Sequence, residues 1–190
     1  MPRAAPARRR WATSSRKGSE TGERSEKDAP GQRRVLIVCH ANTSRSIVTE
    51  ALLKRMLAAR ARDDVVVRSG GIAPFARDTS LISLDTRLLL REDGIEIPPD
   101  ATSCDLKRHR HLLAEADLIV VMTDDQRRML GSFSEADGKE IVTLREAAGE
   151  AGDIADPAGR EADFHRASRD EIRRCLAKAF DRLAPPPNGE

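Results

Sequence analysis

The sequence predicts an α/β protein, a three-layer open sandwich in which a four-stranded parallel sheet carries helices on both faces. Short, nearly continuous runs of apolar and β-branched residues alternate with longer segments of helical periodicity. This alternation is typical of parallel strands that are buried on both faces and joined by helices. At 190 residues, the chain is long enough to form one domain with a buried core.

The first strand is expected at residues 35–38, where four apolar residues follow two arginines. A helical pattern then runs over residues 46–60. The remaining expected elements are a strand at 65–67, a helix at 81–93, a strand at 118–122, a short helix at 124–130, a strand at 141–144 and a final helix at 163–183. Three prolines at 185–187 end the last helix, because proline lacks the backbone N–H that would continue it.

Outside the expected domain at residues 34–184, the chain has a segment at each end. Residues 1–33 hold nine basic and four acidic side chains but almost no large apolar ones, so we expect a disordered basic extension. It is interpreted either as an arm for an acidic partner or as a solvated extension. Residues 185–190 form a short C-terminal tail.

Composition narrows the classes of partner. The net charge of +2 provides no global field, so neither a nucleic acid nor a membrane is expected as the main partner. The three cysteines, Cys39, Cys104 and Cys175, lack CxxC or Cys/His ligand spacing, which argues against a disulfide framework or a structural zinc site. No apolar run is long enough to span a bilayer, so we expect a cytoplasmic protein.

The segment after the first strand is the first place to look for chemistry, because ligands of open α/β sheets bind beyond the carboxyl ends of the strands. A cysteine, five residues, an arginine and a serine lie at this strand-to-helix junction. Successive loop N–H groups and the start of the helix would form a cradle for an anion. The expected anion-binding residues are His40, Ala41, Asn42, Thr43, Ser44, Arg45 and Ser46.

Several residues of this loop have a distinct expected role. The cradle would favour the thiolate of Cys39, the form that attacks phosphorus. Arg45 offers a planar fork that matches two phosphoryl oxygens, and Ser46 can donate its hydroxyl to the Cys39 sulfur. Asn42 tolerates a positive φ and can brace the loop. His40 is interpreted either as a rim residue or as a solvent-facing one.

Transfer of a phosphoryl group to a thiolate also requires a proton for the leaving group and a base for water. Asp156 is the candidate, in a Gly- and Ala-rich loop over residues 147–159 that Pro157 would stiffen. Asp153 is the competing carboxylate.

These motifs resemble the low-molecular-weight protein tyrosine phosphatases over about residues 34–183. The matching segments, in family order, are 38–39 with 45–46, 50–51, 68–71, 116–119 with Met122, and 156–157. The resemblance implies a phosphocysteine intermediate at Cys39, phosphate held by Arg45 and loop amides, and Asp156 as acid and then base. It implies no metal or organic cofactor, and a phosphorylated protein as substrate, with phosphotyrosine as the default.

Three departures from the family pattern concern the substrate. Aromatic residues usually follow the Asp-Pro pair, but this chain has Ala158 and Gly159. Phe75 stands where many members carry tryptophan, so it is interpreted either as one wall of the substrate slot or as a loop anchor. Thr43 is similar to the residue of the bacterial protein-arginine-phosphatase branch, where a hydroxyl could bond a guanidinium nitrogen. Protein-arginine phosphatase is therefore the alternative function.

Two departures within the loop concern protection and strain. Ser44 replaces a second cysteine common in the family, so a protective disulfide with Cys39 is unavailable there. Ala41 replaces a usual glycine and would be strained if its φ were positive. Three other hypotheses stay open: a thiol-dependent arsenate reductase, which would need a relay through Cys104 or Cys175, a non-catalytic phosphate-binding or phosphocarrier module, and a decayed phosphatase. A monomer is expected.

Overall fold

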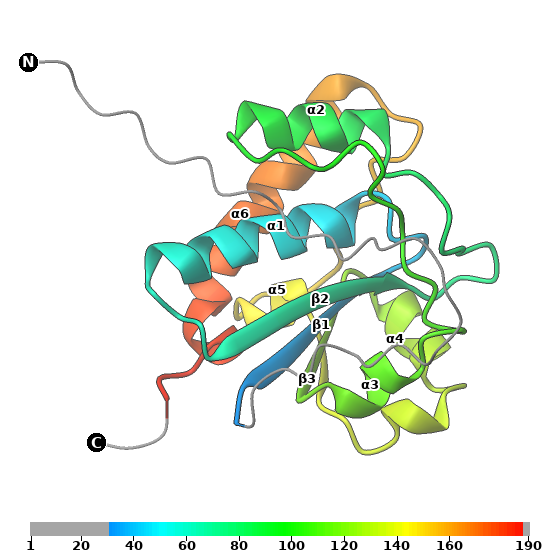
Figure 1. Cartoon of the computed structure of the whole chain (residues 1–190), viewed down its shortest axis with the longest axis vertical. Coiled ribbons are helices and arrows are strands. Elements are labelled where there is room, and N and C mark those ends of the chain that lie inside the picture. The colour runs from blue at the N-terminus through cyan, green and yellow to red at the C-terminus, as the bar shows by residue number, and fades with distance from the viewer. Residues whose placement is uncertain (1–30, 188–190) are drawn as a thin grey trace, which may run out of the picture.

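Four parallel strands form the central sheet of the computed structural model, which describes residues 31–187 (Figure 1). The strands are β1 (Arg33–Cys39), β2 (Val65–Gly71), β3 (Leu118–Val121) and β4 (Ile141–Thr143). Their order in the sheet is β2-β1-β3-β4, so β1 is central. It pairs with β2 over its whole length and with β3 from Val35 to Val38. The predicted fold class is confirmed.

Helices cover both faces of this sheet, and β1 supplies alternate residues to the two cores. Val35 and Ile37 belong to the core beneath α1 (Arg45–Ala59), α2 (Leu84–Glu92), α5 (Leu144–Ala147) and α6 (Ala162–Leu183). Leu36 and Val38 belong to the opposite core with α3 (His111–Glu115), α4 (Asp124–Leu130) and the 3-10 helix η1 (Ser134–Ala136). Because both faces are buried, every residue from Val35 to Cys39 is apolar.

Some element boundaries differ from the sequence prediction. The helix expected over residues 81–93 begins only at Leu84, because Leu81 pairs with Thr102 in an isolated bridge and Ser83 caps the helix. The second strand continues to Gly71, well beyond its three valines. The short helices α3 and α5 were not predicted, since four or five residues are too few for a periodic signal.

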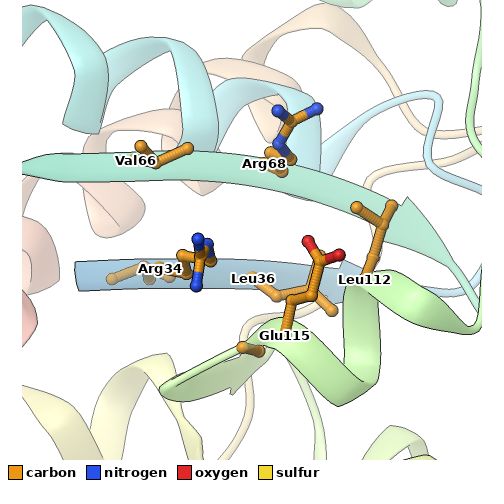
Figure 2. A pocket seen from close by; sticks show the side chains of 8 residues that line it. Arg34, Leu36, Val66, Arg68, Leu112 and Glu115 are labelled. Atoms are coloured by element: carbon orange, nitrogen blue, oxygen red, sulfur yellow. The ribbon is translucent and has the colours of Figure 1, made fainter. Parts of the chain in front are cut away.

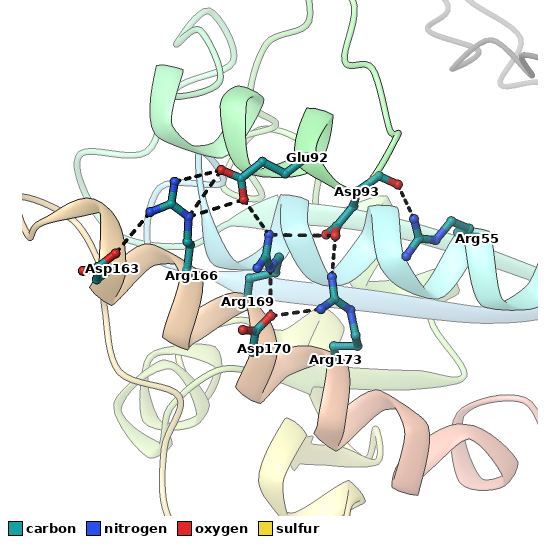
Figure 3. A network of polar contacts seen from close by, with 8 residues as sticks. All are labelled: Arg55, Glu92, Asp93, Asp163, Arg166, Arg169, Asp170 and Arg173. Atoms are coloured by element: carbon teal, nitrogen blue, oxygen red, sulfur yellow. Dashed lines mark hydrogen bonds and ion pairs between the residues drawn. The ribbon is translucent and has the colours of Figure 1, made fainter.

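A network of ion pairs joins the C-terminal end of α2 to α6 and α1 (Figure 3). Glu92 accepts from Arg166 at 2.9 Å and from Arg169 at 3.0 Å. Asp93 pairs with Arg173 at 2.6 Å, and its carbonyl accepts from Arg55 of α1. The network fixes α2 against α6.

Residues 1–30 of the predicted disordered extension lie outside the described residues. Residues 188–190 of the predicted tail also lie outside them. Within the described part, β1 begins at Arg33, one residue before the predicted domain boundary. None of the helices between residues 31 and 187 combines the length and the apolar character that crossing a bilayer requires.

Candidate active site

The predicted phosphate loop lies at the carboxyl end of the central strand, between the end of β1 at Cys39 and the start of α1 at Arg45. The chain that leaves β2 holds its outer side: Ile72 N–H donates to the Cys39 carbonyl at 3.1 Å, and Ala73 N–H donates to the His40 carbonyl at 3.0 Å. Gly71 allows this close approach, because a Cβ there would lie 2.8 Å from the Ala41 carbonyl carbon. The loop is therefore held by main-chain contacts.

Cys39 is buried at the base of this loop, with 3% of its surface exposed. Its Sγ lies 2.9 Å from the Ser46 Oγ and accepts the N–H of Asn42 at 3.2 Å. Hydrogen bonds donated to sulfur stabilise the thiolate relative to the thiol. The surroundings of Cys39 thus suit a nucleophile.

Asn42 braces the loop from inside. Its φ is 59°, in the left-handed region that asparagine tolerates better than most residues. Its Oδ1 accepts the N–H of Cys104 at 2.8 Å, which fixes the orientation of the amide, because a backbone N–H can only donate. Its Nδ2 then donates to Ser46 Oγ at 2.9 Å and to Ser69 Oγ at 2.8 Å.

The hydrogen-bond chain continues to a carboxylate that was not assigned a role from the sequence. Ser69 donates its hydroxyl to Glu50 Oε2, and Lys54 pairs with Glu50 Oε1 at 2.5 Å. Glu50 is buried on α1 among apolar residues. A carboxylate within an apolar helix face is a signal of a specific polar partner, but the sequence does not say which partner.

The start of α1 adds positive potential to the loop. Ser44 is the N-cap residue but makes no side-chain cap, and no acidic residue occupies the first turn. The partial positive charge of the helix N-terminus is therefore not offset by a local carboxylate or hydroxyl. Together with the loop amides, it favours an anion next to Cys39.

Arg45 is buried at the first position of α1, with 3% of its side chain exposed. Its Nη1 donates to the carbonyl of Ile154 at 2.9 Å, and its Nη2 donates to the carboxylate of Asp156. Its own carbonyl accepts the hydroxyl of Thr49 at 2.8 Å. The guanidinium is thus oriented by the loop that carries the predicted acid.

Of the two candidate carboxylates, Asp156 forms the ion pair with the Arg45 guanidinium and Asp153 does not. Asp153 accepts the N–H of Asp124 at 2.9 Å and so caps α4. The Asp156 side chain is 44% exposed, which leaves it open to a leaving group or water. Its Oδ1 accepts the N–H of Ala158 at 3.1 Å, which holds the carboxylate in place after Pro157.

His40 lies between two carboxylates on the rim of the loop. Its Nδ1 is 3.8 Å from Asp156 and 3.4 Å from Arg45 Nη2, and its Nε2 is 3.5 Å from Asp125. Its side chain is 27% exposed. Of the two interpretations of His40, the structure favours the rim, and Asp125 joins the site as a residue that the sequence did not indicate.

A backbone contact also holds Thr43, another of the predicted loop residues. The carbonyl of Thr43 accepts the N–H of Ser83 at 3.2 Å, and its side chain is half-buried. Among the described non-glycine residues, only Asn42 and Ala61 have a positive φ, so Ala41 carries no such strain. Phe75 lies in the segment after β2 and is 63% exposed, so its role as a wall stays a prediction.

The thiol pKa is raised at both of the other two cysteines. Burial, reinforced by the carboxylates of Asp78 and Asp105, raises the pKa of Cys104 to about 12. Burial also raises the pKa of Cys175, which lies in the core on α6. Cys104 nonetheless lies closer to the loop than the sequence suggested, because its N–H bonds to Asn42. The high pKa values argue against a thiol relay for arsenate reduction.

A separate pocket opens between β1, β2 and α3 (Figure 2). Arg34 and Val66, near the amino ends of their strands, line it together with Leu112 and Glu115 of α3. Cys39 is at the opposite end of β1. This pocket is therefore distinct from the candidate active site.

Comparison with known proteins places this geometry in a family. Residues 34–185 match the model of the low molecular weight phosphotyrosine protein phosphatases. The chain is 32% identical to a protein-arginine-phosphatase of Geobacillus stearothermophilus, over 79% of this chain and 95% of the relative. It is 31% identical to the low molecular weight protein-tyrosine-phosphatase PtpB of Staphylococcus haemolyticus, over 76% and 96% of the two chains.

A solved structure agrees with both the fold and the sequence match. The arginine phosphatase YwlE from Geobacillus stearothermophilus superposes with a TM-score of 0.69 at 33% identity, covering 80% of this chain and 92% of that one. The Cys39 loop, Arg45 and Asp156 all lie within the residues that match the family model. The chain belongs to the low molecular weight phosphotyrosine protein phosphatase family.

Proposed function

We propose that the protein hydrolyses phosphorylated side chains of proteins through a phosphocysteine intermediate at Cys39. The observation that carries this proposal is the convergence of three groups at the end of β1. Ser46 Oγ lies 2.9 Å from the Cys39 sulfur, and Arg45 contacts both the Ile154 carbonyl and Asp156. The arginine and the acid are thus in direct contact, and the nucleophile contacts Ser46, the residue that follows the arginine in the chain.

In the first step, the Cys39 thiolate attacks phosphorus and forms the S–P bond while the bond from phosphorus to the leaving group breaks. Arg45 and the loop amides stabilise the charge on the equatorial oxygens. Asp156 gives its proton to the leaving atom. Because Asp156 lies against the Arg45 guanidinium, a phosphate bound by that guanidinium has the acid beside it.

In the second step, water attacks the phosphocysteine, and Asp156 takes the proton that the water loses. The S–P bond breaks, and Cys39 leaves as a thiolate that accepts a hydrogen bond from Ser46. Arg45 and the loop amides stabilise the negative charge of the phosphoryl group, and Asp156 transfers the protons. The proposed mechanism therefore uses no metal or organic cofactor.

Hydrolysis of para-nitrophenyl phosphate by the purified full chain, in the presence of a chelator, tests this proposal. Cys39→Ser should abolish turnover, because the serine hydroxyl is a far weaker nucleophile than a thiolate. Cys175→Ala, in the core, is the matched control and should remain active. Turnover that survives Cys39→Ser would refute the mechanism.

Phosphotyrosine is the default substrate for this family, and phosphoarginine is the second candidate. Thr43 supports phosphoarginine, because its half-buried hydroxyl on the loop could accept a guanidinium N–H. The carboxylates of Asp125 and Asp156, on either side of His40, add negative charge to the rim. Two relatives above 30% identity are named protein-arginine-phosphatases.

Side-by-side kinetics on phosphotyrosine and phosphoarginine peptides distinguish the two substrates. If Thr43 selects phosphoarginine, Thr43→Ile should lower kcat/KM for the phosphoarginine peptide and leave that for the phosphotyrosine peptide equal or higher. An unchanged ratio would show that Thr43 does not select the substrate. Ser44→Ala, at the next position, is the control for local disturbance of the loop.

We also propose that the protein works as a monomer in a reducing compartment such as the cytoplasm. The side chains assigned to catalysis all come from one chain. All three cysteines are free thiols, and Cys39 must stay reduced for its chemistry.

A further inference from the structure

Three side chains with metal-binding atoms converge beside the phosphate loop but take no part in the proposed catalysis. They are Asp78, from the segment between β2 and α2, and Cys104 and His109, from the segment between α2 and α3. A carboxylate oxygen, the sulfur and an imidazole nitrogen all lie within 4.8 Å of one another. Each of the three residues is half-buried, so solvent reaches the cluster.

Neighbouring backbone groups already orient the Asp78 carboxylate. Its Oδ1 accepts the N–H of Asp105 at 2.8 Å and lies 3.0 Å from His109 Nε2. Metal-binding carboxylates in proteins are commonly held by such outer hydrogen bonds. A main-chain donor thus positions the carboxylate independently of His109.

The other two residues have fixed main-chain positions. Cys104 is held on both sides: its N–H donates to Asn42 Oδ1, and its carbonyl accepts the N–H of Gly71, each at 2.8 Å. The N–H of His109 donates to the Asp105 carbonyl at 3.1 Å. The three ligand atoms, all within 4.8 Å of one another, are thus carried by an anchored main chain.

We propose that Asp78, Cys104 and His109 bind one divalent cation of the zinc class, with water as the fourth ligand. Thiolate, imidazole and carboxylate are the ligand types that zinc prefers. Metal–ligand bonds of about 2.0–2.3 Å in a tetrahedral site place ligand atoms about 3.3–3.8 Å apart, so binding would draw the three atoms together from the 4.8 Å within which they lie.

The charges around the cluster are compatible with a cation. Asp105 lies next to it but is paired with Lys107 at 2.7 Å. Arg108 is 3.4 Å from Asp78 Oδ2, but its side chain is 73% exposed and can turn into solvent. The cation would displace the thiol proton of Cys104, so its two positive charges would be met by the thiolate and the Asp78 carboxylate.

The sequence argued against zinc because these residues lack a recognised spacing. Asp78 is far from Cys104 along the chain, and the isolated bridge between Gly71 and Asp105 brings the two segments together. The site is therefore a product of the fold and has no linear motif. It is independent of the proposed phosphatase mechanism, which uses none of these three side chains.

Titration of the metal-free full chain with Co²⁺ tests the proposal, in a Cys39→Ser background that removes the reactive thiol of the phosphate loop. We expect one equivalent of Co²⁺ to produce a thiolate-to-cobalt charge-transfer band and the intense visible bands of a tetrahedral site. Zn²⁺ should then displace the cobalt and abolish both signals. Absence of the charge-transfer band would overturn the proposal.

Variants assign the ligands. Cys104→Ser keeps the size of the side chain and should remove the charge-transfer band. His109→Ala and Asp78→Asn should weaken cobalt binding by about tenfold or more. His111→Ala is the matched control, because the His111 ring is 5.9 Å from that of His109 but His111 is outside the cluster. A band that survives Cys104→Ser, or equal losses in His109→Ala and His111→Ala, would contradict the assignment.

A thermal readout checks the same ligands without cobalt spectroscopy. Zn²⁺ should raise the Tm of the Cys39→Ser protein, because a ligand that binds only the folded state stabilises it. The rise should persist in His111→Ala and be clearly smaller in His109→Ala, whose half-exposed side chain can be removed without loss of the fold. An equal rise in both variants would contradict the proposal.

Discussion

The side-chain amide of Asn42 donates to the hydroxyl of Ser46 at 2.9 Å. A thiolate can only accept, so when Cys39 is a thiolate the hydroxyl of Ser46 must donate to its sulfur, 2.9 Å away. The direction of the whole chain follows from the N–H of Cys104, which fixes the Asn42 amide. A backbone group thus determines that the Asn42 amide nitrogen, and not its oxygen, faces Ser46.

Ser46→Ala should slow breakdown of the phosphocysteine more than its formation. Loss of one hydrogen bond to a charged leaving sulfur costs about 1.5–3 kcal/mol, which corresponds to a fall in kcat of about 10- to 100-fold. Rapid-quench kinetics with para-nitrophenyl phosphate should show a burst of para-nitrophenol followed by slow turnover. Ser44→Ala is the control, because Ser44 makes no side-chain cap. Slow turnover without a burst would contradict this role.

Asp156→Asn should reduce kcat most for substrates with poor leaving groups. An amide cannot supply the proton, and loss of a general acid costs about 10²–10⁴-fold where protonation is needed. The fall should be smaller for para-nitrophenyl phosphate, whose leaving group needs little protonation. Asp153→Asn, which can still cap α4 through its amide oxygen, should behave like the parent enzyme. The same fall for both leaving groups would argue against an acid role for Asp156.

Gly71→Ala should damage the active-site loop, whereas Gly70→Ala should damage only the core. A Cβ at position 71 would lie 2.9 Å from the His40 carbonyl oxygen, whereas one at position 70 would meet the Leu106 side chain at 2.5 Å. Overpacking should lower the unfolding free energy of each variant by about 1–3 kcal/mol. A displaced loop should also cost Gly71→Ala about 10² in kcat. Denaturant melts and kinetics should therefore separate the two neighbours.

Glu92→Gln should lower stability at neutral pH but not in acid. Hydrogen bonds from Arg166 and then Arg169 hold the pKa of the Glu92 carboxyl below its ordinary value of 4.5. The carboxylate therefore contributes stability above its unfolded pKa, and this contribution is lost as the pH falls through the lower folded pKa. The difference in unfolding free energy between parent and Glu92→Gln should shrink below pH 4.5. It should also shrink at high salt, because the pairs are partly exposed.

Much of the fold could be predicted because β1 and β3 are buried on both faces and read as unbroken apolar runs. Cys39, Arg45 and Asp156 could be selected because each residue type has a specific chemical role at its position. The partners of Asn42 could not be predicted. Ser69 and Glu50 are polar residues on elements selected for their apolar pattern, and only the folded packing brings them together.

The loop between α5 and α6 shows the same limit. Asp153 and Asp156 are both plausible acids in sequence, and only the contact with Arg45 distinguishes them. Asp125 on α4 gave no signal, since an acid in the first turn of a helix is expected for the helix alone. Contacts between segments far apart in the chain therefore account for what the sequence did not reveal.

Arg45 is anchored to the main-chain carbonyl of Ile154, and no side chain of the loop takes part in that bond. The bond to Arg45 therefore does not depend on which side chain residue 154 carries, provided that this side chain stays buried. The side chain of Ala158 can then change without touching this anchor, because only the backbone N–H of that residue bonds to Asp156. Substitutions near the rim could in this way change which phosphorylated residue is bound, while Cys39, Arg45 and Asp156 keep their arrangement.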